Sequence, residues 1–309
     1  MNRTSISWTE YTSSPLRYRD ENGRTVWACV HASAGCVNCY AEALAQRFDR
    51  GMTFTAPHIQ SVTPYLDEKE MQALCTSKAI SGKKVFIEDM SDLFGEWVPD
   101  ALIDQVFAVM ALRYDVTFQV LTKRADRVRA YLGAPGRDDI VFEAGTGWRM
   151  GRFANAIFPL PNVWIGVSAE DQQNADERIP LLLETPAAVR FVSIEPMIGP
   201  VDLNCIVPAK LRPEYENDPI VELDALSGLW SGIDEYTPGR AHLDWVIIGG
   251  ESGPHFRHMD PEWARDLVGQ CRDAGVAVWF KQMSGLRPGT APTLDGIEYH
   301  EWPRTRVRV

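Results

Sequence analysis

The sequence has no long apolar run and no excess of positive charge, and both absences limit what the protein can be. The 309-residue chain contains no run of 18 apolar residues, so we expect no membrane-spanning helix. Its first residues, MNRTSISWTEYTSS, lack the apolar segment of a secretory signal peptide. We therefore expect a cytoplasmic protein with no membrane association.

The chain carries 31 Lys and Arg against 42 Asp and Glu, a formal net charge of −11. This balance excludes a protein that coats nucleic acid with its whole surface, because that binding needs dense positive charge. A local basic groove remains compatible with it. The most basic stretch is LTKRADRVRAYLGAPGR, residues 121–137. Its cations either form such a groove or only line the solvated face of a helix.

Two common nucleotide-binding motifs are also missing. The glycine turn GGESG, residues 249–253, matches neither G-x-G-x-x-G nor a phosphate loop with G-K-[ST].

The motif of zinc deaminases is missing too. The cysteine segment AGCVNC lacks the proline of P-C-x-x-C and is not paired with H-x-E, so a zinc deaminase is excluded. There is no internal repeat and no low-complexity tract.

Short apolar runs alternate with helical patterns along much of the chain. Such runs, joined by helices, predict an α/β fold with a parallel sheet. An open doubly wound sheet and a closed or partly closed barrel both fit this pattern. Two stretches interrupt it, residues 133–160 and 205–241, and we expect these to be insertions that form lids or surface decoration. The expected strands cover 84–88, 117–122, 162–168, 189–196, 244–250 and 276–280, and the expected helices 98–113, 171–184 and 260–275.

Polar residues gather where the expected strands end. In parallel α/β folds the carboxyl ends of the strands are where sites are built, although caps and turns use the same residue types. Lys123 and Lys281 are the best-placed cations for a carboxylate or phosphate. The segments are EDMSDLF (88–94), TKR (122–124), SAED (168–171), SIEP (193–196) and GGESG (249–253).

Three of the six cysteines, Cys29, Cys36 and Cys39, have the spacing C-x6-C-x2-C with no fourth cysteine nearby. In a reducing compartment clustered cysteines bind metal more often than they form disulfides. A four-iron cluster with one unligated iron explains the missing ligand. Zinc with three cysteines and a histidine, His31 or His58, is the alternative, and so is no metal at all. The other three cysteines are expected to pack in the core.

Taken together, these residues resemble the radical S-adenosylmethionine superfamily, and more closely a phage-associated family of unassigned function. Within the superfamily the layout is most similar to the branch of spore photoproduct lyase, which repairs a thymine dimer. The resemblance covers nearly the whole chain. The motifs that carry it are TSISWT (4–9), CVNCYAE (36–42), SDLF (91–94), FQVLTKR (118–124), IGVSAED (165–171), RIPLLLETPAAVRFVSIEP (178–196) and DWVIIGGESG through FKQ (244–282).

The resemblance implies a partial (β/α)6-type barrel of parallel strands, related to the TIM barrel, with helices outside. Residues 1–284 would form this domain and residues 285–309 a C-terminal extension. Cys29, Cys36 and Cys39 would ligate three irons of a [4Fe-4S] cluster in the loop after the first strand. S-adenosylmethionine (SAM) would chelate the fourth iron, and one electron would cleave it to methionine and a 5′-deoxyadenosyl radical.

Two features depart from the superfamily pattern. The usual cysteine spacing is C-x3-C-x2-C, and the usual Gly-Gly-Glu for the SAM amino group follows the second strand. Here that strand end reads EDMSD, while Gly-Gly-Glu follows the sixth. The cofactor-binding candidates are therefore chosen by strand-end position. They are Ser91, Asp92, Thr122, Lys123, Ser168 and Glu195, with Gly249, Gly250 and Glu251 as a further place for the adenine and ribose.

The expected function is that of a radical SAM enzyme acting on a nucleic-acid base or nucleotide, by modification or repair-type chemistry of phage DNA. The expected partners are an electron donor of flavodoxin or ferredoxin type, a DNA or nucleotide substrate and an adjacent partner protein. A phage-encoded chain would work in the host-cell cytoplasm. The alternative is a non-catalytic nucleic-acid or protein partner stabilised by zinc or an iron–sulfur cluster.

Overall fold

The computed structural model describes residues 1–49, 52–145, 158–208, 222–231 and 241–304. The contacts of the chain divide it into two compact units. The first consists of Met1–Ile165 with Pro186–Ala188, and the second of Gly166–Thr185 with Val189–Val309. Each unit is described by itself below.

The first unit contains strands of two sheets, the main sheet and a separate three-stranded sheet. In one, β2 pairs with β6 and β6 with β7, both in parallel, and the short β1 pairs antiparallel with β2. In the other, β3 lies between β4 and β5 with antiparallel pairing. The strands are β1 (Asn2–Arg3), β2 (Tyr11–Ser13), β3 (Leu16–Arg19), β4 (Thr25–Val26), β5 (Thr63–Leu66), β6 (Lys84–Ile87) and β7 (Thr117–Thr122).

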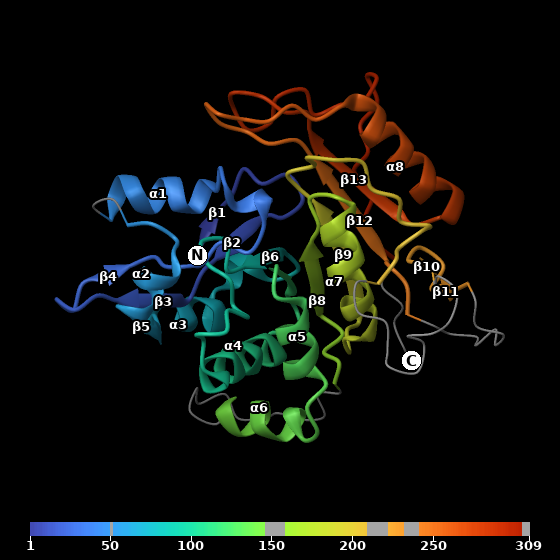
Figure 1. Cartoon of the computed structure of the whole chain (residues 1–309). Coiled ribbons are helices and arrows are strands. Elements are labelled where there is room, and N and C mark those ends of the chain that lie inside the picture. Colours follow the sequence, from blue (N-terminus) through green and yellow to red (C-terminus); the bar gives the residue numbers. More distant parts are fainter. Residues whose placement is uncertain (50–51, 146–157, 209–221, 232–240, 305–309) are drawn as a thin grey trace. The chain divides into compact units, whose positions relative to one another are not determined.

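The helices of the first unit include α4, whose buried face carries Ile103, Val106, Phe107 and Met110. This i, i+3, i+4, i+7 spacing is the apolar stripe of a helix that packs against a core, in the segment where the sequence predicts a helix. Helix α6 lies beside α4 (Figure 1). The helices are α1 (Tyr40–Phe48), α2 (Ala56–Gln60), α3 (Glu68–Thr76), α4 (Asp100–Leu112), α5 (Ala125–Leu132) and α6 (Arg137–Gly145), with 3-10 turns at Ala34–Cys36 and Lys78–Ile80.

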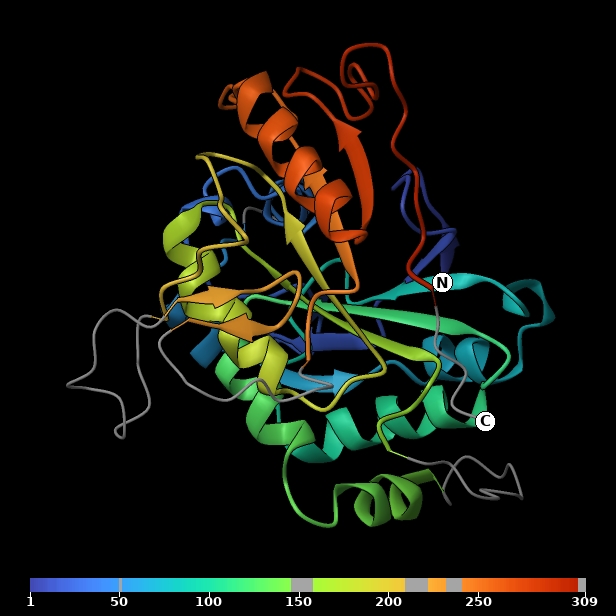
Figure 2. The ribbon, with the colours of Figure 1, turned by 90° about the vertical axis from the view of Figure 1, so that its right-hand side faces the viewer.

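The second unit is built on parallel strands, in which β12 pairs with β9 on one side and β13 on the other. All five residues of β12 are buried, as expected for a strand covered on both faces. Helix α8 runs beside β13 (Figure 2). The elements are α7 (Gln172–Glu184), β9 (Val189–Ile194), β10 (Leu223–Asp224), β11 (Leu229–Trp230), β12 (Trp245–Gly249), α8 (Pro261–Ala274) and β13 (Ala277–Gln282).

Helix α8 begins and ends at residues that stabilise helix termini. The Asp260 side chain accepts a hydrogen bond from the backbone N–H of Glu262, and Pro261 occupies the first helical position. Gly275 ends the helix with a left-handed φ of 69°, a conformation that costs glycine little. The residue types at both ends of α8 are therefore those that the sequence alone would assign to a helix start and a helix end.

The strand order of the main sheet is β1-β2-β6-β7-β8-β9-β12-β13, with β8 (Val163–Ser168) shared between the units. The parallel strands follow one another in chain order, without the reversal that defines a doubly wound sheet. The doubly wound alternative is therefore wrong. The end strands β1 and β13 are not neighbours in this order, so a closed TIM-like barrel is not shown. No helix in the described residues is long and apolar enough to cross a membrane.

The described parts of the two predicted insertions contain α6 and the antiparallel pair β10–β11. Residues 146–157, 209–221 and 232–240, which make up the rest, lie outside the described residues. Within the predicted C-terminal extension, the backbone N–H of Glu301 donates to the carbonyl of Val278, and Trp302 packs against Trp245. Glu301 and Trp302 therefore pack against strands β13 and β12 of the second unit.

Candidate functional site

The three clustered cysteines lie in the loop between β4 and α1 of the first unit. Each is half-buried. Cys39 occupies the residue before the first turn of α1. Cys29 and Cys39 pack with Trp27 and Met90 against a small apolar cluster of Ala41, Ala45 and Phe54. The loop follows the β3–β4 hairpin, so an antiparallel sheet that the sequence analysis did not predict separates it from β2.

The environment of Cys29 and Cys39 disfavours a reactive thiolate. Burial raises the pKa of Cys29, with the nearby Asp92 and Cys39 adding to the effect. Burial also raises the pKa of Cys39, which interacts electrostatically with Cys36. The backbone N–H of Ala32 donates to the Cys36 sulfur at 3.4 Å. Since a nucleophilic cysteine needs a lowered pKa, the raised values disfavour Cys29 and Cys39 as catalytic nucleophiles. A bound metal ion would replace their protons.

A chain of hydrogen bonds supports the start of the loop. Trp97 Nε1 donates to the Tyr18 hydroxyl at 2.9 Å, and that hydroxyl lies 3.0 Å from Ser91 Oγ. Ser91 Oγ donates to the carbonyl of Ala28 at 3.0 Å. An indole N–H can only donate and a carbonyl can only accept, so the direction of every bond is fixed. Ser91 thus holds the residue next to Cys29.

The carboxyl ends of β6 and β7 are joined through Asp92. Its Oδ1 accepts a 2.7 Å hydrogen bond from Thr122 Oγ1, and its Oδ2 accepts one from the Lys123 backbone N–H at 3.0 Å. Arg124 Nη2 donates to the carbonyl of Val30, inside the cysteine loop, at 2.9 Å. Ser91, Asp92, Thr122 and Lys123, all predicted from strand-end position, therefore lie together beside the cysteines.

Glu88 was not predicted as a site residue, although it opens the strand-end segment EDMSD. Its side chain is buried, and its backbone has a left-handed φ of 64°. Oε1 accepts a 2.7 Å hydrogen bond from the backbone N–H of Leu16, but buried Oε2 has no hydrogen-bond partner. Strained backbone and an unsatisfied buried carboxyl both mark functional sites. Nearby, the Tyr40 hydroxyl donates to the carbonyl of Asp89, which connects this strand end to α1.

Glu88 should make stability depend on pH. Burial raises its pKa well above the ordinary value. From about pH 4.3, the unfolded value, up to the raised folded pKa, the folded protein binds more protons than the unfolded chain. This contribution to stability is complete below that range and is lost as pH rises. Compared with wild type, Glu88→Gln should gain about 1.4 kcal/mol of stability per pH unit across this window. Urea unfolding from pH 5 to 8 measures it.

The matched control for this experiment is Glu68→Gln, which changes an exposed carboxylate in the first turn of α3. If the free energies of unfolding of wild type and Glu88→Gln differ by the same amount at every pH, Glu88 is not a buried carboxyl that holds its proton in the folded state.

The five predicted residues of the second unit lie at strand ends, but the structure gives their polar groups structural partners. The Ser168 carbonyl accepts a 2.8 Å hydrogen bond from Arg178 Nη1, which also contacts Glu170 at 3.2 Å. Glu195 forms an ion pair with Lys281. Glu251 accepts hydrogen bonds from the Arg257 side chain at 2.6 and 3.0 Å and from its backbone N–H at 2.8 Å.

The two glycines of the GGESG turn permit close packing of the protein's own chain. A Cβ on Gly249 would lie 3.2 Å from the Glu195 carboxyl carbon. A Cβ on Gly250 would lie 2.2 Å from the backbone nitrogen of Ser284 and 2.7 Å from the carbonyl carbon of Met283. Because backbone atoms cannot move aside like a flexible side chain, Gly250 is required for packing whether or not a ligand binds here.

Gly250→Ala is therefore expected to destabilise the protein by about 3 kcal/mol, the upper part of the range for overpacking. Gly269→Ala is the matched control, since a Cβ there meets nothing within 4 Å and alanine favours a helix interior. Thermal unfolding of the two variants measures the difference. Equal melting temperatures would show that the turn tolerates a side chain.

The basic segment 121–137 does not form an open cationic groove in the described structure. Arg137 is buried and bonded to Asp104 at 2.8 Å and Asp100 at 3.0 Å. Arg127 also pairs with Asp100, Arg124 with Glu96 and Arg129 with Asp126. The arginines instead connect α5 and α6 to acidic residues of their own unit, and the segment no longer argues for a nucleic-acid substrate.

Of the two histidines that could complete a zinc site, His31 is already bonded, whereas the buried Nε2 of His58 has no hydrogen-bond partner in the described part of the chain. His31 Nε2 lies 2.7 Å from Glu42 Oε2, and Glu42 Oε1 accepts a hydrogen bond from the Phe54 backbone N–H at 2.8 Å. Among the described residues, no group of three or more His, Cys, Asp or Glu is arranged as a metal site. Cys75 and Cys271 are buried, as expected for packing residues, whereas Cys205 is half-buried.

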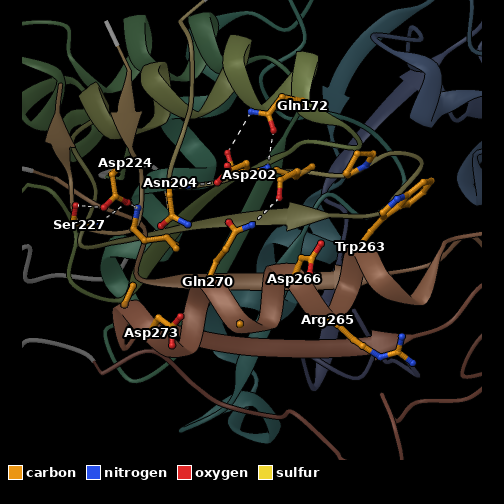
Figure 3. A pocket seen from close by; sticks show the side chains of 15 residues that line it. Gln172, Asp202, Asn204, Asp224, Ser227, Trp263, Arg265, Asp266, Gln270 and Asp273 are labelled. Atoms are coloured by element: carbon orange, nitrogen blue, oxygen red, sulfur yellow. Dashed lines mark hydrogen bonds between the residues drawn. The ribbon is translucent and has the colours of Figure 1, made fainter. Parts of the chain in front are cut away.

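The second unit has a cavity of about 1010 Å³ beside α8 (Figure 3). Its wall includes Asp202, Asp266 and Asp273 together with Trp263. Asp224, also in the wall, is bonded within its own turn to Ser227. None of the predicted site residues lines this cavity.

Comparison with known proteins adds a family without an assigned activity. The model of the family "Protein of unknown function (DUF5131)" matches residues 3–302. A search of curated proteins and a search of solved structures each gave no match.

Proposed function

We propose that this chain, which belongs to the DUF5131 family, is a radical SAM enzyme whose [4Fe-4S] cluster is held by Cys29, Cys36 and Cys39. The observation that carries the proposal is the position of the cysteine loop. Three half-buried thiols share one loop, which is bonded to the carboxyl ends of β6 and β7 through Arg124, Ser91 and Tyr40. We further propose that the main sheet is a partial (β/α)6-type barrel.

The residues of the cysteine loop and of the β6 strand end fit a [4Fe-4S] cluster with bound SAM. Thiols are the ligands of iron–sulfur clusters, and a three-cysteine set leaves one iron open. The N–H of Ala32 that donates to the Cys36 sulfur is the kind of contact that tunes such a cluster. The unsatisfied carboxyl oxygen of Glu88 fits the ammonium group of SAM, which would give this buried acid the hydrogen bond it lacks.

Each neighbouring residue then has a physical role. Ser91 and Arg124 hold the backbone at Ala28 and Val30, on either side of Cys29. Asp92 fixes the ends of β6 and β7 relative to each other by bonding Thr122 and Lys123. Glu88 would release its proton to solvent when an ammonium group binds beside it, and the resulting carboxylate would be the counter-ion of that group. When bound, the cluster supplies the single electron that cleaves the sulfonium bond of SAM.

The proposed substrate, a nucleic-acid base or nucleotide, rests on the resemblance alone, because the arginines of segment 121–137 are paired within their own unit. The test of activity uses anaerobically reconstituted protein with dithionite and SAM. The proposal expects 5′-deoxyadenosine and methionine as products. A faster release of 5′-deoxyadenosine with a thymine-containing oligonucleotide than without it would support the substrate class. No SAM cleavage under any condition would favour the non-catalytic alternative.

A further inference from the structure

Helix α1 has apolar residues on two faces, and only one of them is buried. Ala41 and Ala45 pack inward against Phe54. Next to this packed face, Tyr40, Leu44 and Phe48 are 50%, 39% and 68% exposed, and Val37, in the cysteine loop before the helix, is 62% exposed. The spacing of four residues places Tyr40, Leu44 and Phe48 along one line of the helix. We call these four residues the α1 stripe. A surface helix usually turns polar residues outward, so an exposed apolar line indicates an interaction surface.

The α1 stripe begins inside the cysteine loop. Val37 lies between Cys36 and Cys39, and Tyr40 directly follows Cys39 at the start of α1. A protein docked on the stripe would therefore contact the segment that carries the thiols. This continuity favours a partner that exchanges something with the thiol-bound group.

The charge around the stripe selects the chemistry of that partner. In a chain of net charge −11, residues 31–48 expose no carboxylate. Their one acid, Glu42, is buried and bonded to His31 and the Phe54 N–H. Arg47 is exposed beside Phe48. An apolar surface with a cation and no exposed acid is complementary to an acidic protein. A single arginine is too little charge to favour nucleic acid.

The stripe alone is too small for a stable dimer contact. One side of a nine-residue helix, about 13 Å long and about 10 Å wide, covers far less than the roughly 800 Å² per partner of a stable interface. Weak electron-transfer complexes occupy the small end of that range. The stripe thus fits a transient partner better than a second copy of this chain.

We propose that the α1 stripe, with Arg47, docks a small acidic one-electron carrier of the flavodoxin type. This inference rests on the proposed function, because a cluster that cleaves SAM must be reduced by one electron. In that transfer the reduced carrier loses one electron and the thiol-bound site gains it. No bond forms or breaks and no proton moves.

The experiment compares Phe48→Glu and Leu44→Glu with the control Tyr114→Glu, which changes another exposed apolar residue of the first unit, 83% exposed. Isothermal titration with a bacterial flavodoxin at low salt gives the affinity, whether or not a cluster is present. Stopped-flow absorbance gives the rate of reduction by reduced flavodoxin and by dithionite, which needs no docking surface. We expect each stripe variant to bind about tenfold more weakly, the order of a hot-spot residue. Tyr114→Glu should bind as wild type does.

Three results would overturn the inference: no binding of flavodoxin by the wild type, equal binding by the stripe variants, or a dimer in light scattering that Leu44→Glu dissociates. A protein that holds iron and is reduced by dithionite, yet transfers electrons from flavodoxin at the same rate with Phe48→Glu, contradicts the docking surface alone. Absence of iron after reconstitution contradicts the proposed function, and the titration then still decides whether the stripe binds the carrier.

Discussion

Cys36→Ala is expected to lose its iron, from about four atoms per chain in the reconstituted wild type to nearly none. The reason is that each cysteine would hold one iron, and the loop offers no fourth thiol to replace it. A structural zinc site would lose its metal too, so the metal must be identified. Iron and sulfide analysis with the ultraviolet–visible spectrum distinguishes the two.

The control for this variant is Cys205→Ala. Cys205 is a half-buried cysteine of the second unit and is not a proposed ligand. It should keep the full iron content and spectrum of the wild type. Iron that survives in Cys36→Ala, or that is lost equally in Cys205→Ala, would show that the three-cysteine loop is not the cluster site.

Glu88→Gln is expected to weaken SAM binding by about a hundredfold while leaving iron content unchanged. Removing one partner of a buried charge pair commonly costs 2–5 kcal/mol, and a hundredfold is about 2.7 kcal/mol. Glutamine keeps the size of the side chain but cannot become the counter-ion of an ammonium group. The same variant should be more stable than wild type without ligand, because it needs no proton to be neutral.

Isothermal titration with SAM in two buffers of different ionisation enthalpy measures both the affinity for SAM and the number of protons released on binding. Since burial raises the pKa of Glu88, wild type should release a proton when SAM binds at neutral pH, and Glu88→Gln should not. Glu68→Gln is again the control. If Glu88→Gln binds SAM as tightly as wild type, with equal proton release, Glu88 does not contact the cofactor.

The regular elements could be predicted because their signals are local. Apolar runs identified β12 and β13, and Asp260, Pro261 and Gly275 marked both ends of α8. The antiparallel sheet of β3, β4 and β5 was missed. Its strands have two to four residues, too few for an alternating pattern to stand out.

The candidate site was predictable where parallel strands bring their ends together. Asp92 and Thr122 are 30 positions apart in the chain, yet they are bonded at 2.7 Å because β6 and β7 are parallel neighbours. Contacts between residues of different loops could not be predicted from strand order. The pairing of Glu251 with Arg257 and the contact of Gly250 with Ser284 are set by loop paths. Glu88 is exceptional through its φ and its unsatisfied oxygen, which only coordinates reveal.

The most direct test of the central claim is the electron paramagnetic resonance spectrum of the anaerobically reconstituted, dithionite-reduced protein before and after addition of SAM. A site in which Cys29, Cys36 and Cys39 hold a four-iron cluster with one open iron predicts a reduced-cluster signal that shifts when SAM binds. A protein that contains one zinc or no metal after reconstitution, or a cluster signal that SAM leaves unchanged, would contradict it.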